Sequence, residues 1–138
     1  MSDLRSIPFT GDRVSDMVLL LEAIIEDVPV ADSLPGDYVA DRDGPCMVVE
    51  GDGTPEASPL HSVQTVRVLM HAQTRPMAHQ LMDIVDGILL TLSLLGIGIA
   101  IRPGQRLITV LDDESPDRHF ISSAGYSVEA ATRKVHLP

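Results

Sequence analysis

Aromatic residues are scarce in this chain of 138 residues, which contains two Tyr, two Phe and no Trp. Proteins that bind single-stranded nucleic acid or sugar rings usually stack them on aromatic side chains. Both kinds of binding are therefore disfavoured. The apolar fraction is nevertheless 44 %, which is typical of a globular protein. The sequence thus predicts a folded core built from Leu, Ile, Val, Met and Ala.

Cysteine is nearly absent, since Cys46 is the only one. A single cysteine excludes a disulfide within the chain and fits a reducing compartment. Cys46 opens the apolar stretch 46–50, which predicts a buried structural residue rather than a nucleophile.

Basic residues are outnumbered, with 10 Lys and Arg against 20 Asp and Glu, giving a net charge of −10. Residues 1–60 hold 13 of the acids and 3 Arg, whereas residues 61–138 hold 7 of each sign. An acidic surface repels phosphate, which argues against direct DNA binding. Two interpretations remain: a solvated face, or a surface that lies beside DNA without holding it.

A hydrophobic run long enough to cross a bilayer is also missing. The longest uncharged stretch, 87–101, falls short of the roughly 20 residues that a span requires, and Gly96 and Gly98 interrupt it. This stretch predicts the end of a helix followed by a buried strand. The N-terminus lacks the layout of a signal peptide, so we expect no membrane association.

Apolar spacing predicts helices in two places. We expect residues 1–11 to form a flexible arm and Asp12 to cap a helix that runs to about Glu26. A second helix is predicted at 75–95. The apolar positions expected to face the core are Val14, Met17, Val18, Leu21, Ile24 and Ile25 in the first, and Met77, Leu81, Ile84, Val85, Ile88, Leu89, Leu92 and Leu95 in the second.

Alternating apolar residues predict the strands. Strands 46–50 and 61–72 are expected to pair as a hairpin across a turn-rich connection at 51–59. Residues 31–45 read as a loop with a short extended piece at Tyr38 and Val39. Further strands are predicted at 97–101, 106–113 and 119–133. A turn at 102–105 is expected to let strand 106–113 return antiparallel to strand 97–101. Gly125 is expected to mark a bulge. The fold class is therefore α+β: residues 1–138 form a single domain, a mostly antiparallel sheet with two helices packed on one face.

Catalytic motifs are not found in the sequence. Asp112, Asp113, Glu114 and Asp117 crowd one loop next to His119, but their spacing is not that of an EF-hand. We interpret them as a solvated loop. No glycine-rich phosphate loop or activated nucleophile is recognisable. We therefore predict no catalytic, cofactor-binding or metal-binding residues, and no enzyme.

A second candidate metal site lies in the predicted helix 75–95. His79, Asp83 and Asp86 share one helical face, which is also how the polar side of an amphipathic helix looks. His61, His71 and His136 show no ligand spacing. A small metal-dependent enzyme using either group remains an alternative.

Three stretches of the chain resemble the tail terminators of long-tailed bacteriophages, also called tail completion or minor tail proteins. The first is the opening helix with the VP of EDVPV and its loop, 14–35. The second is the strand-to-helix join VRVLMHAQTRPMAHQLMDIVDGIL, 66–89, with its QTR link. The third is ESPDRHFISSAGYSVEAATR, 114–133. The acidic first half, and a strand 61–72 without aromatics, depart from the family's pattern.

The resemblance implies a structural virion protein that acts as a ring, typically of six copies. Such a ring caps the tail tube, ends its polymerisation and forms the head–tail joining surface. The implied partners are further copies of the chain, the tail tube protein and the connector or neck proteins. The implied location is the tail or neck of a virion assembled in the host cytoplasm. A head–tail connector subunit is the nearest alternative.

Within this hypothesis, two polar tips are expected to make assembly contacts. They are the tip containing Asp52, Thr54, Glu56 and Ser58, and the tip containing Asp112, Asp113, Glu114 and Asp117. An acidic lumen is expected from Asp41, Asp43 and Asp52, since like charges would let DNA pass without being held.

Overall fold

The structure, a computed structural model, describes residues 12–51, 56–57, 61–92 and 99–131. In chain order, the elements are α1 (Arg13–Ile24), β1 (Val30–Ala31), α2 (Ala40–Asp43), β2 (Cys46–Gly51), β3 (Glu56–Ala57), β4 (His61–Ala72), α3 (Arg75–Leu92), β5 (Ala100–Pro103), β6 (Ile108–Leu111) and β7 (Phe120–Ala131). The predicted arm at 1–11 lies outside the described residues.

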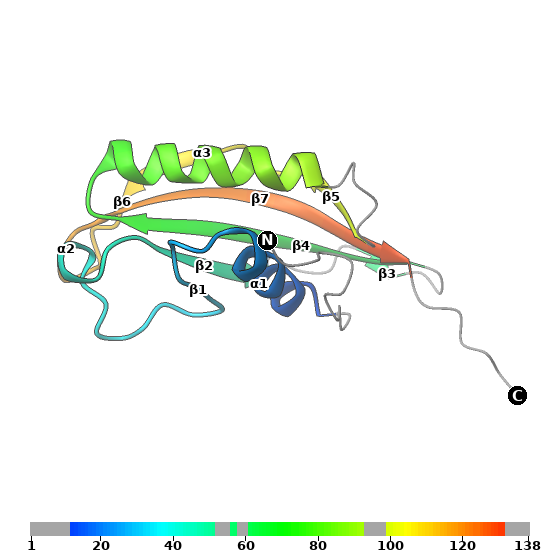
Figure 1. The fold of residues 1–138 in the computed structure, drawn as a ribbon, viewed down its shortest axis with the longest axis horizontal. Helices are drawn as coiled ribbons and strands as arrows, with labels where there is room; N and C mark the ends of the chain where they lie inside the picture. The colour runs from blue at the N-terminus through cyan, green and yellow to red at the C-terminus, as the bar shows by residue number, and fades with distance from the viewer. Residues whose placement is uncertain (1–11, 52–55, 58–60, 93–98, 132–138) are drawn as a thin grey trace, which may run out of the picture.

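The seven strands of the described residues form one mixed sheet in the order β1-β2-β4-β7-β5, with β3 on β4 and β6 on β7. Only β1 is parallel to its neighbour, β2; the other pairs are antiparallel. The 12-residue strands β4 and β7 pair along their whole length and form the spine of the molecule (Figure 1).

The two long helices cover one face of this sheet, as predicted. Alternate residues of the central strands, such as Val49, Val66 and Val68, are buried on this face. They share a single core with Met17 of α1 and Leu89 of α3. Helix α1 packs over β2, whereas α3 packs over β7 and β4. The α+β prediction is confirmed.

Helix α1 begins as the sequence predicts. The carboxylate of the N-cap residue Asp12 accepts a hydrogen bond from the amide of Val14 at 3.2 Å, which satisfies one of the free N–H groups of the first turn. The buried face also holds Arg13 and Asp16, paired at 2.5 Å. Apolar periodicity cannot reveal such a buried ion pair, because both residues count as polar.

Helix α3 is turned relative to the predicted face. Ala78 and Met82 are fully buried, whereas Met77 is 39 % and Ile84 is 57 % exposed. The predicted apolar positions cover more of the helix circumference than a sheet surface can contact. The nearly buried Asp86 of α3 faces the sheet and accepts a hydrogen bond from the Tyr126 hydroxyl of β7, which fixes the rotation of the helix about its axis. The predicted orientation was therefore wrong on one flank.

Strands β5 and β6 do not form the predicted hairpin. Both pair antiparallel with β7, so they run in the same direction along one sheet edge. Residues 104–107 bulge out between them. The bulge is fixed by two bonds of 2.9 Å, from Gly104 N to Gly125 O and from Gly125 N to Gln105 O. The predicted bulge thus lies on the edge strand opposite Gly125.

Two predicted boundaries also change. Strand β5 begins at Ala100 and includes Pro103. Proline has no backbone N–H, and an edge strand tolerates this because the donor is not needed on its outer side. Residues 93–98, between α3 and β5, lie outside the described part. None of the helices within the described ranges combines the length and apolarity needed to cross a bilayer.

Val39, in the expected extended piece, has an extended backbone and is the N-cap of the short helix α2. The Asp43 carboxylate accepts the Val39 amide at 2.9 Å and closes this turn. Strand β1 was not predicted either, because its two residues are ordered by β2 rather than by a pattern of their own.

Candidate functional site

Glu56, which is the described residue of the first predicted tip, and the 112–118 loop lie at opposite ends of the sheet. Glu56 is in β3, paired opposite Val63 near the start of β4. The 112–118 loop follows β6, whose last residue Leu111 pairs with Phe120, at the other end of the spine (Figure 1). Glu56 lies opposite Val63, and the loop adjoins the Phe120–Ala72 pair, so the nine residue steps of β4 between Val63 and Ala72 separate them by roughly 30 Å. Asp52, Thr54 and Ser58 lie outside the described residues.

The 112–118 loop is closed by its own backbone and side chains. Asp112 N donates to His119 O at 2.9 Å, and the Asp112 carboxylate accepts the Glu114 amide at 3.1 Å. Asp113 is exposed and pairs with Arg118 at 3.3 Å. Across the described ranges, the structure gathers no three His, Cys, Asp or Glu side chains that could hold a metal ion.

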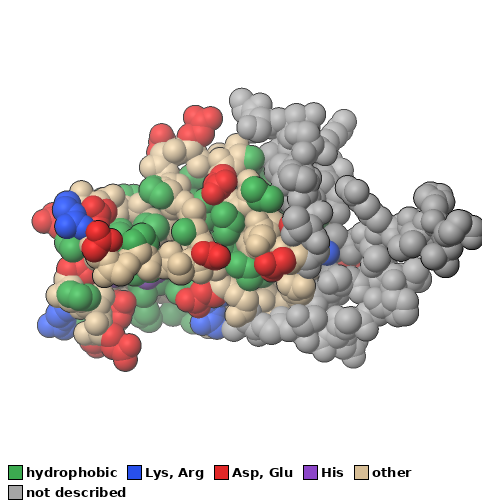
Figure 2. All heavy atoms as spheres, turned by 90° about the horizontal axis from the view of Figure 1, so that it is seen from below, with side chains coloured by type: hydrophobic (Ala, Val, Ile, Leu, Met, Phe, Trp, Pro, Cys, Tyr) green, Lys and Arg blue, Asp and Glu red, His purple; other side chains and the backbone are tan. Residues whose placement is uncertain are grey.

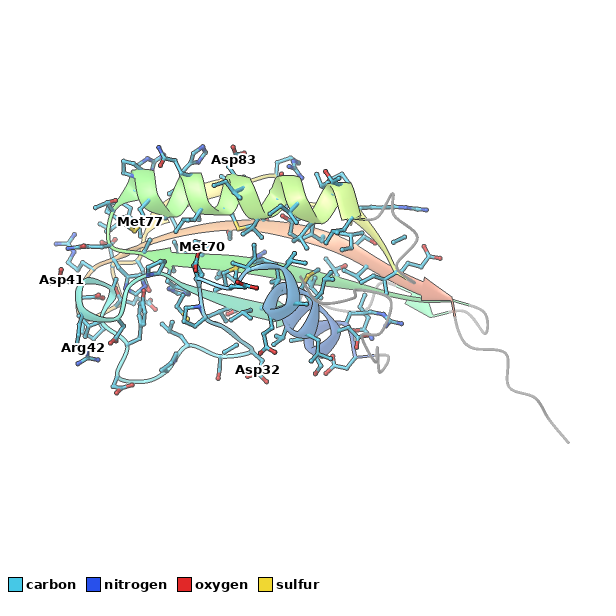
Figure 3. The ribbon with its side chains drawn as sticks, viewed as in Figure 1. Asp32, Asp41, Arg42, Met70, Met77 and Asp83 are labelled. Carbon is cyan, nitrogen blue, oxygen red and sulfur yellow. The ribbon has the colours of Figure 1, made fainter. Side chains whose placement is uncertain are left out.

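The predicted lumen residues Asp41 and Asp43 lie on α2, at the same end of the molecule as this loop (Figure 3). The Arg42 guanidinium binds Asp43 at 2.9 Å and, with the Val39 amide, lowers the pKa of this carboxyl to about 2. Asp41 accepts a hydrogen bond from Gln73 at 2.9 Å. The acidic character of α2 is thus partly offset by Arg42.

A buried chain of polar side chains joins α2, β4 and the 112–118 loop. His71 Nδ1 lies 2.7 Å from His119 Nε2, and His119 Nδ1 lies 2.7 Å from Asp117 Oδ1. Asp117 Oδ2 accepts the amide of Ala40 at 2.7 Å. His119 Nδ1–H donates to the Asp117 carboxylate, and in the tautomer that leaves His119 Nε2 without a proton, His71 Nδ1–H donates to it. We call His71, His119 and Asp117 the histidine chain.

The histidine chain lies under the ring of Tyr38. Its centroid is 6.0 Å from that of His71 and 5.3 Å from that of His119, with both contacts edge-on. Burial, followed by the neighbouring His119, lowers the pKa of His71 to about 4. Burial likewise raises the pKa of Tyr38 to about 12, and its hydroxyl donates to Gly44 O at 2.6 Å.

Cys46 lies opposite His71 in the β2–β4 pairing, which raises the question of a Cys–His–Asp catalytic arrangement. The thiol points to the carbonyl of Met47 at 3.7 Å, and burial raises its pKa. An activated cysteine needs the opposite shift and access to substrate. His71 and His119 are only 5 % and 2 % exposed. The histidine chain therefore links α2, β4 and the 112–118 loop through hydrogen bonds.

His79, Asp83 and Asp86 do not form the candidate metal site considered for α3. Asp86 belongs instead to a second buried polar group. Asp86 accepts the Tyr126 hydroxyl and an Arg106 N–H, both at 2.6 Å. Burial, followed by the hydrogen bond to Asp86, raises the pKa of Tyr126. His79 lies 3.3 Å from Thr109 Oγ1, and Asp83 lies on the outer side of α3 (Figure 3). The structure thus separates the three side chains.

Sequence reasoning missed the histidine chain because its parts are far apart. His71 and His119 are separated by 48 residues, and neither has a metal-ligand spacing. Only the register of β4 against β7, with His71 opposite Ile121, places them together. No local pattern reports this pairing.

No protein-family model matches the chain, and no curated protein is similar to it in sequence. The function is therefore argued from the residues, the fold and the three stretches described above.

Proposed function

We propose that this protein is a ring-forming tail terminator of a long-tailed bacteriophage. The observation that carries the proposal is the long β4–β7 spine, at whose opposite ends lie Glu56 and the 112–118 loop. A terminator must contact the tail tube on one side and the neck on the other. A subunit with contact tips at both ends, and sheet edges on its sides, suits this task.

In this proposal, the tip containing Glu56 and the 112–118 loop meet the tail tube and the connector proteins, in one order or the other. The remaining sides of the sheet meet neighbouring copies in a ring of, typically, six. The buried contacts of Asp117 give the second tip a fixed shape, since a loop tied to α2 and β4 loses little further freedom when it binds.

The acidic lumen is the second element of the proposal. Figure 2 shows one face of the molecule, on which acidic side chains are spread over the described part and basic ones are fewer. Asp41, Asp43 and Asp52 would face the channel, and DNA would pass without specific binding. Changing all three to Lys should impair tail assembly or infectivity, and normal infectivity of that variant would overturn the lumen assignment.

A head–tail connector subunit would use the same fold and the same ring. It differs from a terminator in the part of the virion to which it is attached. Antibody labelling of isolated tails and isolated heads distinguishes them, because a terminator is found on tails made in the absence of heads. Calorimetric titration with Mg²⁺, Ca²⁺ and Zn²⁺ tests the alternative of a metal-dependent enzyme. Saturable binding of one of these ions would support that alternative.

Native mass spectrometry of the purified protein over a range of concentrations tests the ring. The expected result is one closed oligomer, with six copies as the main species. A discrete dimer at every concentration would count against a terminator. A strict monomer would require the same measurement on tail tubes incubated with the protein.

A further inference from the structure

The two edges of the sheet differ in charge. At one edge, β1 is flanked by the end of α1, and Glu22 and Glu26 line a hollow there together with Val30. Asp27 and Asp32 lie on either side of β1 in sequence, and all four carboxylates are exposed. Within the described part of the chain, no cation pairs with any of these four. We call Glu22, Glu26, Asp27 and Asp32 the acidic edge.

The opposite edge, formed by β5 and β6, carries arginines. Arg102 is exposed on β5 and has no partner among the described residues. Arg75 reaches β6 from α3, where its Nη1 donates to Thr109 O at 3.0 Å. Arg106, in the bulge, is 53 % exposed although it pairs with Asp86. We call Arg75, Arg102 and Arg106 the basic edge.

Apolar side chains lie between these arginines. Ile108 and Val110 alternate along β6 and are 43 % and 49 % exposed. An edge strand with exposed β-branched residues is a surface that another protein chain can cover.

We propose that copies of this chain join head to tail, with the acidic edge of one copy seated on the basic edge of the next. This inference rests on the proposed ring and names the surfaces that close it. The occupant is a second copy because one chain supplies both complementary halves. In Figures 1 and 3 the acidic edge, marked by Asp32, lies across the sheet from β5 and β6, so one copy cannot satisfy itself.

The charge pattern also selects the geometry. A two-fold contact would set basic edge against basic edge, or acidic edge against acidic edge, and like charges repel. A head-to-tail contact matches opposite charges and leaves one free edge of each kind. Such contacts repeat until the rotation closes a ring. Ile108 and Val110 would be removed from water at each contact.

Charge-swap variants test this pairing. The acidic-edge variant carries Lys at all four acidic positions (Glu22→Lys, Glu26→Lys, Asp27→Lys and Asp32→Lys), which turns that edge from −4 to +4. The basic-edge variant carries Arg75→Glu and Arg102→Glu, which turns the other edge from +3 to −1. Each alone should lose at least tenfold in its apparent association constant, measured by sedimentation equilibrium, because its own two edges now repel. An equimolar mixture should reassemble, since each reversed edge then meets a complementary one. Native mass spectrometry should show assemblies with an even number of copies.

Matched controls keep the result interpretable. Asp83→Lys changes one exposed carboxylate on the outer side of α3 and should assemble as the wild type does. Circular dichroism of every variant checks that the fold is retained. A chain carrying all six substitutions should also assemble, because its edges again carry opposite charges. Assembly should weaken at least tenfold between about 0.02 and 0.5 M salt, as the Debye length shortens.

Failure of this inference and failure of the proposed function give different results. If the wild type forms a ring and both edge variants form it equally well, the edge pairing is overturned and the terminator proposal still stands. A wild-type protein that stays monomeric at millimolar concentration and low salt would also overturn it, since the edges would not suffice to join copies. Loss of assembly in both variants without rescue on mixing would do the same.

Discussion

The pKa of His71 makes a sharp prediction about stability against pH. Burial lowers this pKa from 6.5 to about 4. Between these values the unfolded chain binds a proton that the folded chain does not. The contribution of His71 to the free energy of unfolding should therefore be fully present above pH 6.5 and decrease as the pH falls towards 4. Below pH 4 this residue should cause no further loss. The loss amounts to about 3 kcal/mol, at about 1.4 kcal/mol for each pH unit.

The matched variant is His71→Asn, whose side-chain N–H can still donate to His119 but which does not titrate. It should be less stable at pH 7 by about 1–2 kcal/mol because the amide fills less space. Its stability should change little between pH 6.5 and 4. The lowered pKa values of Asp43 and Asp117 act only below their unfolded value of 3.8, outside this window.

Urea unfolding at half-unit pH steps measures both proteins, and His79→Asn serves as the control because His79 is exposed. The control should keep the full pH dependence. The reasoning would be refuted by a wild type that loses less than about 1 kcal/mol over this window. It would equally be refuted by a His71→Asn variant that loses as much as the wild type.

Three further predictions concern the fold. Tyr126→Phe removes the hydroxyl that donates to Asp86, and urea unfolding should show a loss of about 1–3 kcal/mol; no change would mean that the bond contributes nothing. Leu89→Ala should cost about 2–5 kcal/mol because Leu89 is fully buried, whereas Ile84→Ala on the exposed flank should cost under about 1 kcal/mol; equal losses would contradict the described orientation of α3. Asp12→Ala should cost about 1 kcal/mol through loss of the N-cap of α1, with Asp12→Asn as the nearly neutral control, and equal losses in both would implicate the charge instead.

Local patterns were sufficient for the parts of the fold that depend on neighbours in sequence. The cap at Asp12, the strand pattern of 61–72 and the helix that follows it are each set by side chains within a few residues. The antiparallel pairing of β2 with β4 also followed, because a turn-rich connection joins the two strands. The packing of both long helices on one face follows from the single apolar face of β4.

Features that depend on distant partners could not be predicted in this way. Pro103-Gly104 reads as a turn, yet Gly104 is held in a bulge by Gly125, which comes 21 positions later in the chain. Asp86 reads as a polar surface residue, but Tyr126 and Arg106 draw it inside. In both cases a tertiary hydrogen bond outweighs the local propensity of the segment.

The candidate site follows the same division. The acidic loop at 112–118 was visible in composition, whereas the inward turn of Asp117 was not. That carboxylate was expected among the outward assembly contacts, but it binds His119 and the Ala40 amide instead. It is only 17 % exposed. In the proposed assembly, the contact tip therefore consists of Asp112, Asp113 and Glu114.

Single-particle electron cryomicroscopy of the purified protein tests the central claim most directly. The proposed function predicts a closed ring with a central channel wide enough for double-stranded DNA. It further predicts the tip containing Glu56 on one rim and the 112–118 loop on the other. A compact two-fold dimer, or a ring with both tips on the same rim, would contradict it.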